Sequence, residues 1–190
     1  NMSICYGMTE LSPVSHQTLK SDSFIQRTCT VGRNLPHTVT KIVDDKGNIV
    51  PRGVEGEICT RGFGKMIGYF EDPKATNEAI DDEGYMKTGD IGVIDDEGYL
   101  KIVGRMKDII IRGGENISPK EIEDYLGTHS KIDMVQVISV KDDKFGDEIC
   151  AWVKLKEGET LTKEEVALYC KSKLAHFKIP RYVKFVKEFP

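Results

Sequence analysis

The sequence predicts a mixed α/β and α+β fold, in which a β-rich, distorted barrel-like subdomain is followed by a small, mobile α+β domain. From Val31 to Gly104, short alternating segments are separated by turns rich in Asp and Gly. Two helix starts of the Ser/Thr-x-x-Glu type occur only after this region, each before an apolar stripe. The run Gly104–Pro119 separates the two patterns. We therefore expect one domain over 1–106, with its β-rich part at about 30–106, and another over 107–190.

The composition favours a globular protein and argues against several classes of partner. Of the 190 residues, 31 % are charged and 39 % hydrophobic, and the net charge of −4 does not favour nucleic-acid binding. No apolar run approaches the roughly 20 residues that cross a bilayer, so we expect no membrane span. Residues 163–190 hold seven Lys/Arg against three Glu. A basic end of this kind is either a solvated face or suited to a polyanion such as a nucleotide or coenzyme A.

The cysteines and histidines show no pattern of a disulfide framework or a metal site. Five cysteines, at positions 5, 29, 59, 150 and 170, are an odd number without a close pair, and the four histidines are scattered. We expect reduced thiols in an intracellular compartment and no structural zinc. The first residues also lack the basic and then apolar pattern of a secretion signal.

The sequence of the first half of the chain predicts short strands and one helix. Ser3–Glu10 begins with a short apolar run that stops at Tyr6-Gly7, which is typical of a buried strand delivering functional groups, or of a strand before an ordinary turn. Asp72 can cap a helix that has Pro73 at its first position and runs to about Ile80. The expected strands and the Asp/Gly turns beside them are Thr38–Val43, Asp44–Gly47, Gly56–Arg61, Asp81–Gly84, Ile91–Ile94, Asp95–Gly98 and Tyr99–Val103.

The second half carries stronger helix signals. Ser118–Glu121 is a capping box with Pro at the first helical position, and we expect the helix to stop at Gly127. Met134–Val140 is almost entirely apolar, which predicts a strand covered on both faces. The remaining expected elements are a strand at Ile149–Leu155, a second capping box at Thr162–Glu165 with an apolar stripe reaching Phe177, and a strand at Tyr182–Val186.

The run between the halves mixes charges, a short apolar strand and a glycine pair. We interpret Arg105–Asp108 as a hinge and Gly113–Asn116 as a loop that faces a substrate, because glycines without a Cβ let a backbone approach a ligand closely. The alternative is an ordinary strand–turn–helix connection.

A few polar residues have the chemistry of a nucleotide site. The carboxylate of Glu10 could hold Mg²⁺, and the Thr9 hydroxyl could bond a phosphate oxygen. Thr88-Gly89-Asp90 is expected at a turn, where Asp90 could take both hydroxyls of a ribose. Arg105 offers a planar fork of donors for phosphate or ribose oxygens.

The ordered set of motifs resembles the adenylate-forming superfamily of acyl-CoA synthetases, 4-coumarate ligases, luciferases and peptide-synthetase adenylation domains, and within it the medium-chain acyl-CoA synthetases. The set covers essentially the whole chain and is Tyr6-Gly7-Met8-Thr9-Glu10, Gly56-Glu57-Ile58-Cys59-Thr60-Arg61-Gly62, Gly68-Tyr69, Tyr85-x-x-Thr88-Gly89-Asp90, Gly104-Arg105-x-Lys107-Asp108, Gly113-Gly114-Glu115-Asn116-Ile117, Pro119-x-Glu121-Ile122-Glu123 and Lys178-x-Pro180.

The resemblance implies a role for each matching residue. The catalytic pair would be Thr9, touching the phosphate of an acyl-adenylate, and Glu10, holding Mg²⁺. Lys107 would be the position about which the second domain swivels. Glu57 and Arg61 fit the pattern as structural residues. The implied cofactor-binding residues are Tyr6 against the adenine, Gly7, Asp90 on the ribose diol, Arg105 on ribose or phosphate oxygens, and Gly113, Gly114 and Glu115 along the pantetheine passage.

The resemblance also implies a reaction. A fatty acid attacks ATP to give acyl-AMP and pyrophosphate, the second domain rotates, and the thiol of coenzyme A displaces AMP. The implied cofactors are ATP/AMP, Mg²⁺ and coenzyme A, the implied partners are small molecules, and a homo-oligomer is left open. The compartment would be the mitochondrial matrix in a eukaryote and the cytoplasm otherwise.

This sequence departs from the family pattern at two places. The phosphate loop of the family lies upstream of Tyr6, and its catalytic lysine follows in a Gly-Lys pair beyond Pro190; the chain contains neither. We therefore expect the C-terminal portion of a longer enzyme that does not adenylate by itself. The alternatives are an aryl-CoA ligase or carrier-protein adenylation domain, and a non-catalytic binding or structural protein that keeps the fold.

Overall fold

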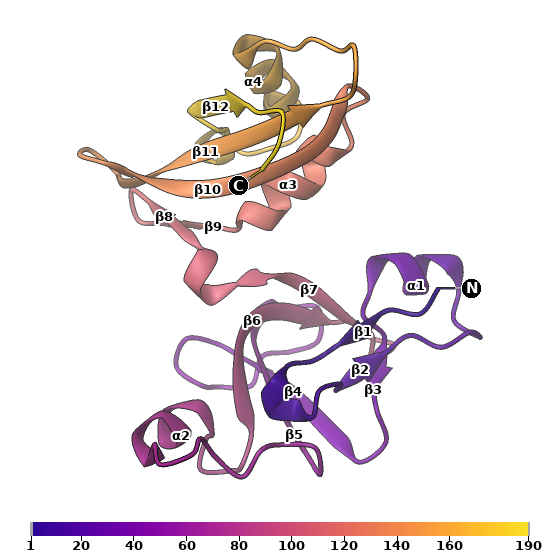
Figure 1. Ribbon diagram of the computed structural model, residues 1–190. Coiled ribbons are helices and arrows are strands. Elements are labelled where there is room, and N and C mark those ends of the chain that lie inside the picture. Colours follow the sequence, from indigo (N-terminus) through magenta and orange to yellow (C-terminus); the bar gives the residue numbers. More distant parts are fainter. Residues whose placement is uncertain (1, 190) are drawn as a thin grey trace. The chain divides into compact units, whose positions relative to one another are not determined.

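The computed structural model describes residues 2–189, and the chain divides into two compact units, Asn1–Met106 and Lys107–Pro190. The described part of the chain contains three sheets and four α-helices, which confirms the mixed, strand-rich class (Figure 1). Each unit has its own core of buried apolar residues.

The first unit is built on an antiparallel sheet whose strands follow one another in sequence order. Ile42, Ile58 and Leu100 form its core. The Asp/Gly turns between strands form as expected; the Asp44 carboxylate, for example, accepts the amide hydrogens of Lys46 and Asn48. The strands are β4 (Thr38–Val43), β5 (Gly56–Gly62), β6 (Met86–Ile94) and β7 (Leu100–Arg105).

A second, smaller sheet of the first unit carries the N-terminal motif. It consists of β1 (Cys5–Tyr6), β2 (His16–Gln17) and β3 (Arg33–Asn34), all antiparallel, with the short helices η1 (Thr9–Leu11) and α1 (Phe24–Cys29) between them. Of the two interpretations of the first strand, the buried one does not hold. Cys5 is exposed and Tyr6 half-buried, because this two-residue strand pairs only with β2. The alternative, a strand followed by a turn, describes it better.

The first unit confirms one helix and corrects one turn. Helix α2 (Pro73–Ala79) begins as expected, with the Asp72 carboxylate accepting the Ala75 amide hydrogen. Residues Thr88–Asp90, however, do not form a turn. They lie inside β6, where the register against β5 shifts and Gly89 adopts a φ of 70°. The segment is therefore a bulge within a strand.

The second unit has a five-stranded sheet in the order β10-β11-β8-β9, with β12 parallel to β11 (Figure 1). The long curved hairpin of β10 and β11 dominates it. Its strands are β8 (Ile110–Arg112), β9 (Glu115–Ile117), β10 (Ile132–Asp142), β11 (Gly146–Leu155) and β12 (Tyr182–Phe185). Its helices are η2 (Met106–Asp108), whose Met106 still belongs to the first unit, α3 (Pro119–Gly127), α4 (Lys163–Lys171) and η3 (His176–Lys178).

Both α-helices of the second unit pack on one face of its sheet. Ile122 of α3 and Val166 of α4 are buried in the same core, and the rings of Tyr125 and Tyr169 stack 4.8 Å apart. The other face of the hairpin is left open: Met134 is 54 % and Ile138 is 38 % exposed. The expectation that β10 is covered on both faces is therefore wrong, because within residues 107–189 both α-helices pack on the opposite face.

The two expected capping boxes have different outcomes. The Thr162 box forms in full, with Thr162 and Glu165 bonding each other's backbone amides. Ser118 occupies the N-cap of α3 without a side-chain capping bond, and the Glu121 carboxylate pairs with Lys178 at 2.6 Å. Helix α3 includes Gly127 as its last residue.

The apolar residues that were expected at the end of the last helix contact the core, but they lie outside that helix. Helix α4 ends at Lys171, and Leu174 and Phe177 pack against the core from the segment that follows it. All five cysteines are free thiols. Among residues 2–189, no helix is long and apolar enough to cross a membrane.

Candidate functional site

Three of the predicted site residues meet in the first unit around the carboxylate of Asp90. The Tyr6 hydroxyl donates to Asp90 Oδ2 at 2.8 Å, and Arg105 Nε lies 3.1 Å from Asp90 Oδ1. Tyr6 comes from β1, Asp90 from β6 and Arg105 from β7. The fold therefore gathers residues that are up to 99 positions apart in the sequence.

The local geometry of β6 explains the position of Asp90. Asp90 and Arg105 are direct cross-strand partners, so the register of the sheet places the two charges side by side. The bulge that precedes Asp90 is held by the carboxylate of Glu57, which accepts the Gly89 amide hydrogen at 3.1 Å, and by the Thr88 hydroxyl, which donates to the carbonyl of Ile58 at 2.8 Å. Glu57 is thus structural.

The cluster combines a largely buried hydrogen-bond acceptor, Asp90, with an exposed hydrogen-bond donor, Arg105. The Asp90 side chain is 14 % exposed and that of Arg105 is 60 % exposed. Burial raises the pKa of the Tyr6 hydroxyl well above its ordinary value, so this group stays a neutral donor. Each carboxylate oxygen keeps further acceptor capacity, which suits hydroxyl donors such as those of a sugar, while the guanidinium suits anionic oxygens.

The two predicted catalytic residues, Thr9 and Glu10, begin η1 just after β1. The Glu10 carboxylate accepts the hydroxyl of Tyr69 at 2.8 Å, and its backbone carbonyl accepts the Met66 amide at 2.8 Å. This hydrogen bond to Glu10 is also the main reason why the pKa of Tyr69 is raised. Sequence reasoning assigned Tyr69 no role, although the motif Gly68-Tyr69 could have drawn attention to it.

The surroundings of Glu10 fit Mg²⁺ only as an ion that arrives with a phosphate ligand. Among residues 2–189, no group of three His, Cys, Asp or Glu side chains could hold a metal. Mg²⁺ is commonly held by one or two carboxylates together with the phosphates of a substrate. A single carboxylate whose position is set by Tyr69 fits that arrangement.

Gly7 is required because the loop between β1 and β2 folds back onto it. A Cβ at this position would lie 1.9 Å from the carbonyl oxygen of Pro13. The loop brings the Ser15 amide to the carbonyl of Tyr6 at 2.8 Å. Gly7 therefore shapes the segment that carries Tyr6, Thr9 and Glu10.

In the second unit, the predicted residues lie at its start and in a tight hairpin. Lys107 belongs to η2. Gly113 and Gly114 have φ values of 59° and 91° and form a two-residue turn between β8 and β9. Glu115 and Asn116 are strand residues of β9, so the substrate-facing loop expected over Gly113–Asn116 is reduced to the glycine pair.

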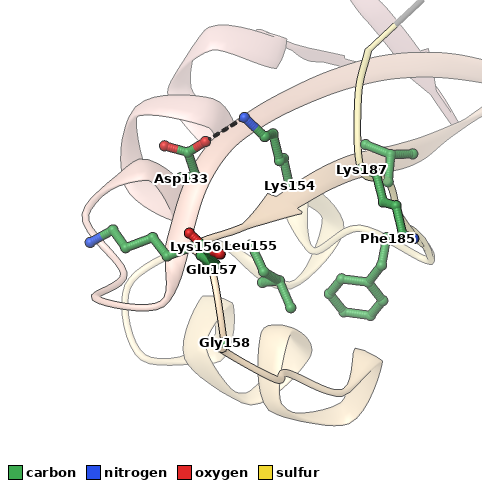
Figure 2. A pocket seen from close by; sticks show the side chains of 9 residues that line it. Asp133, Lys154, Leu155, Lys156, Glu157, Gly158, Phe185 and Lys187 are labelled. Atoms are coloured by element: carbon green, nitrogen blue, oxygen red, sulfur yellow. Dashed lines mark ion pairs between the residues drawn. The ribbon is translucent and has the colours of Figure 1, made fainter.

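The second unit also has a cavity of about 990 Å³ (Figure 2). Asp133 and Lys154, which border it, form an ion pair of 2.7 Å across its edge. The cavity contains none of the predicted site residues and no group with a catalytic arrangement. The polar cluster of the first unit is therefore the better candidate site.

Comparisons with known proteins point to one family. The model of the AMP-binding enzyme family matches residues 1–70, and that of the AMP-binding enzyme C-terminal domain matches residues 121–190. The Bacillus subtilis (strain 168) protein YngI is 51 % identical over all of this chain and 35 % of its own length. The medium-chain acyl-CoA ligase ACSF2, mitochondrial, of Bos taurus is 48 % identical over 98 % of this chain and 31 % of its own length.

The structural comparison agrees. The crystal structure of ATP-bound MatB from Rhodopseudomonas palustris is 34 % identical and matches with a TM-score of 0.94 over all of this chain and 37 % of that chain. The chain thus spans about a third of the length of the relatives it matches. The motifs, the fold and these matches together show that the chain belongs to the AMP-binding, adenylate-forming enzyme family.

Proposed function

We propose that the protein carrying this chain is an AMP-forming acid–thiol ligase that makes acyl-CoA from a fatty acid, ATP and coenzyme A. The observation that carries the proposal is the cluster of Tyr6, Asp90 and Arg105, in a chain that is 48 % identical to a medium-chain acyl-CoA ligase. We infer a medium-chain substrate from the same relative.

Each residue of the cluster has a role that its contacts support. The Asp90 carboxylate accepts hydrogen bonds from the two ribose hydroxyls, and the hydroxyl of Tyr6 holds that carboxylate from behind. The ring of Tyr6 offers an apolar surface to adenine. The exposed guanidinium of Arg105 donates to ribose or phosphate oxygens.

The adenylation step adds the residues of η1. The Thr9 hydroxyl donates to the phosphate of the acyl-adenylate. Glu10, held by Tyr69, is the residue that would hold Mg²⁺, which when bound neutralises charge on the phosphates.

The thioester step uses the second unit. Lys107 lies where one unit ends and the other begins, and we assign it the hinge. The glycine pair Gly113-Gly114 and the neighbouring Glu115 are assigned to the pantetheine passage of coenzyme A, because two residues without a Cβ leave room for a narrow chain. We also propose an intracellular location, mitochondrial in a eukaryote.

The direct test is an activity assay that compares several acids as substrates. The full-length protein, given ATP, Mg²⁺ and coenzyme A with fatty acids of increasing length, is expected to release AMP and acyl-CoA, most rapidly with medium-chain acids. Aryl acids and a carrier protein are the comparison substrates; a preference for either would replace the fatty-acid assignment.

Two further outcomes bear on the proposal. The 190-residue chain alone is expected to release no pyrophosphate from ATP, Mg²⁺ and a fatty acid. If the full-length protein binds neither ATP nor AMP, the interpretation as a non-catalytic protein that keeps the fold replaces the interpretation as a ligase.

A further inference from the structure

The second unit contains a carboxylate that is completely buried. Glu148 of β11 is 0 % exposed, and its Oε1 accepts from Arg112 Nε at 2.8 Å. Arg181 Nη1 lies 3.6 Å from the same oxygen. An ionised carboxylate is buried at reasonable cost only when it is paired, and here two guanidinium groups share that task.

Arg112 connects this buried charge to the glycine turn. It is the last residue of β8 and directly precedes Gly113. Its guanidinium lies 4.7 Å from the centre of the Phe145 ring and donates to the carbonyl of Phe177 at 3.4 Å. Because Glu148, Phe145 and Phe177 contact it from three directions, the side chain of Arg112 is fixed.

Phe145 in turn fixes the glycine turn. Its carbonyl accepts the Gly113 amide hydrogen at 2.9 Å, and a Cβ at Gly113 would lie 3.2 Å from Cδ1 of its ring. The glycine turn is thus tied, through its backbone, to the tip of the β10–β11 hairpin.

Asp142 closes the network at the hairpin tip. Its carboxylate accepts the amide hydrogens of Lys144 and Phe145, both at 3.0 Å, and pairs with Arg181 at 3.2 Å. These amide bonds, that of Phe145 first, lower the pKa of Asp142, so the carboxylate remains charged. Arg181 therefore bridges Asp142 at the tip and Glu148 in the interior.

We propose that Glu148 and Asp142, bridged by Arg181, are positioning residues for the thioester-forming step, acting through Arg112 and Phe145 on the turn at Gly113-Gly114. The inference rests on the proposed function, which places coenzyme A at that turn. Neither residue needs to touch a substrate. Their charges hold the turn at the geometry that leaves the passage open, so they affect the second half-reaction and leave adenylation intact.

The test compares two variants with a matched control in the full-length enzyme. Glu148→Gln keeps the shape of the side chain and removes its charge, and Asp142→Asn does the same at the hairpin tip. Lys141→Met is the control, since it breaks the exposed ion pair of Lys141 with Asp147 on the same hairpin. ATP–pyrophosphate exchange measures adenylation, and conversion of preformed acyl-adenylate to acyl-CoA measures the second step.

For Glu148→Gln we expect the second step to slow about tenfold, the scale of losing one charged hydrogen bond, with adenylation within about twofold of wild type. The amide of Gly113 should exchange with solvent about tenfold faster. Asp142→Asn should act in the same direction, and Lys141→Met should change neither quantity.

Equal loss of both half-reactions in Glu148→Gln, or unchanged exchange at Gly113, would overturn the proposal. If Glu148→Gln fails to fold, the same outcomes are read from Asp142→Asn. If the wild-type enzyme makes no acyl-CoA, the proposed function fails, and the exchange rate at Gly113 still decides whether the network holds the turn.

Discussion

At the scale of single residues, the carboxylates of Asp90 and Glu148 are each held by a partner that lies far away in the sequence. Tyr6 donates to Asp90 across 84 positions, from a strand of the other sheet of the first unit. Arg112 donates to the buried Glu148 across 36 positions, from another strand. Residue type and motif identified Tyr6, Glu10, Asp90 and Arg105 as candidates, but Glu148 has no signature in the sequence because its pairing depends on the tertiary fold.

The buried His16 leads to a prediction on acid stability. Its side chain is 0 % exposed, Nδ1 lies 2.9 Å from the Ser15 hydroxyl, and Nε2 is buried without a hydrogen-bond partner. Burial lowers the pKa of His16 to about 4. Below about pH 6.5 the unfolded chain therefore binds a proton at His16, whereas the folded chain does not until about pH 4. The unfolding free energy of the first unit should thus decrease as the pH falls from 6.5 toward 4, by up to about 3 kcal/mol.

The measurement is hydrogen exchange of the first unit at pH 7 and pH 4.5. His16→Phe, which cannot take up the proton, should lose less stability over this range than the wild type does. Exchange of the backbone amide of Trp152, which lies in the second unit, serves as an internal control that the substitution leaves unchanged. Identical pH profiles for the variant and wild type would contradict the account.

At the scale of elements, the sequence predicts local features better than non-local ones. The cap of α2 by Asp72 and the Thr162 capping box depend on contacts three residues apart, and both form. The box at Ser118 lacks the side-chain capping bond, and the carboxylate of Glu121 pairs with Lys178, 57 positions away. The segment at Thr88–Asp90 was expected as a turn because its composition suits both a turn and a bulge, and only the pairing of β5 with β6 decides between them.

The bulge yields a prediction on the site. Gly89→Ala places a Cβ where nothing lies within 4 Å, so its effect comes only from the φ of 70°. We expect a loss of about 1–2 kcal/mol in the unfolding free energy of the first unit, the usual cost of a left-handed residue with a side chain. Relief of that strain should also turn Asp90 away and weaken AMP binding, as measured by calorimetry.

Gly84→Ala is the matched control. Gly84 also has a positive φ, 79°, with nothing near its would-be Cβ, but it lies in the turn before Tyr85. It should cost similar stability and leave AMP affinity unchanged. Equal weakening of AMP binding by both substitutions would show that the bulge has no special role in orienting Asp90.

At the scale of the whole molecule, the sequence changes from short strands separated by Asp/Gly turns to helices with capping boxes. This change predicted a β-rich part followed by a small α+β domain. Two compact units follow one another along the chain, the first with two sheets and the second with one, and each has its own core. The open face of β10 could not be foreseen, because an apolar run does not reveal which faces of a strand will be covered. The swivelling of one unit on the other remains a prediction.

Lys107→Pro tests that swivel in the full-length enzyme. Proline fixes φ near −65°, so a domain rotation that requires a change of φ at this residue is blocked. We expect thioester formation to fall more than adenylation, because only the second step needs the rotated arrangement. Lys107→Ala, which removes the charge and keeps the rotation, is the control, and an equal loss of both steps in the proline variant would remove the hinge assignment.

Tyr6, Asp90 and Arg105 are proposed to bind a nucleotide together. The most direct test of this proposal is calorimetric titration of AMP into the full-length protein and two variants, Asp90→Asn and Asp96→Asn, the second at an exposed position in the neighbouring turn. We predict that Asp90→Asn weakens AMP binding by at least about tenfold, since charged hydrogen bonds to the ribose are lost, while Asp96→Asn matches the wild type. AMP affinity that is unchanged in Asp90→Asn would contradict the account.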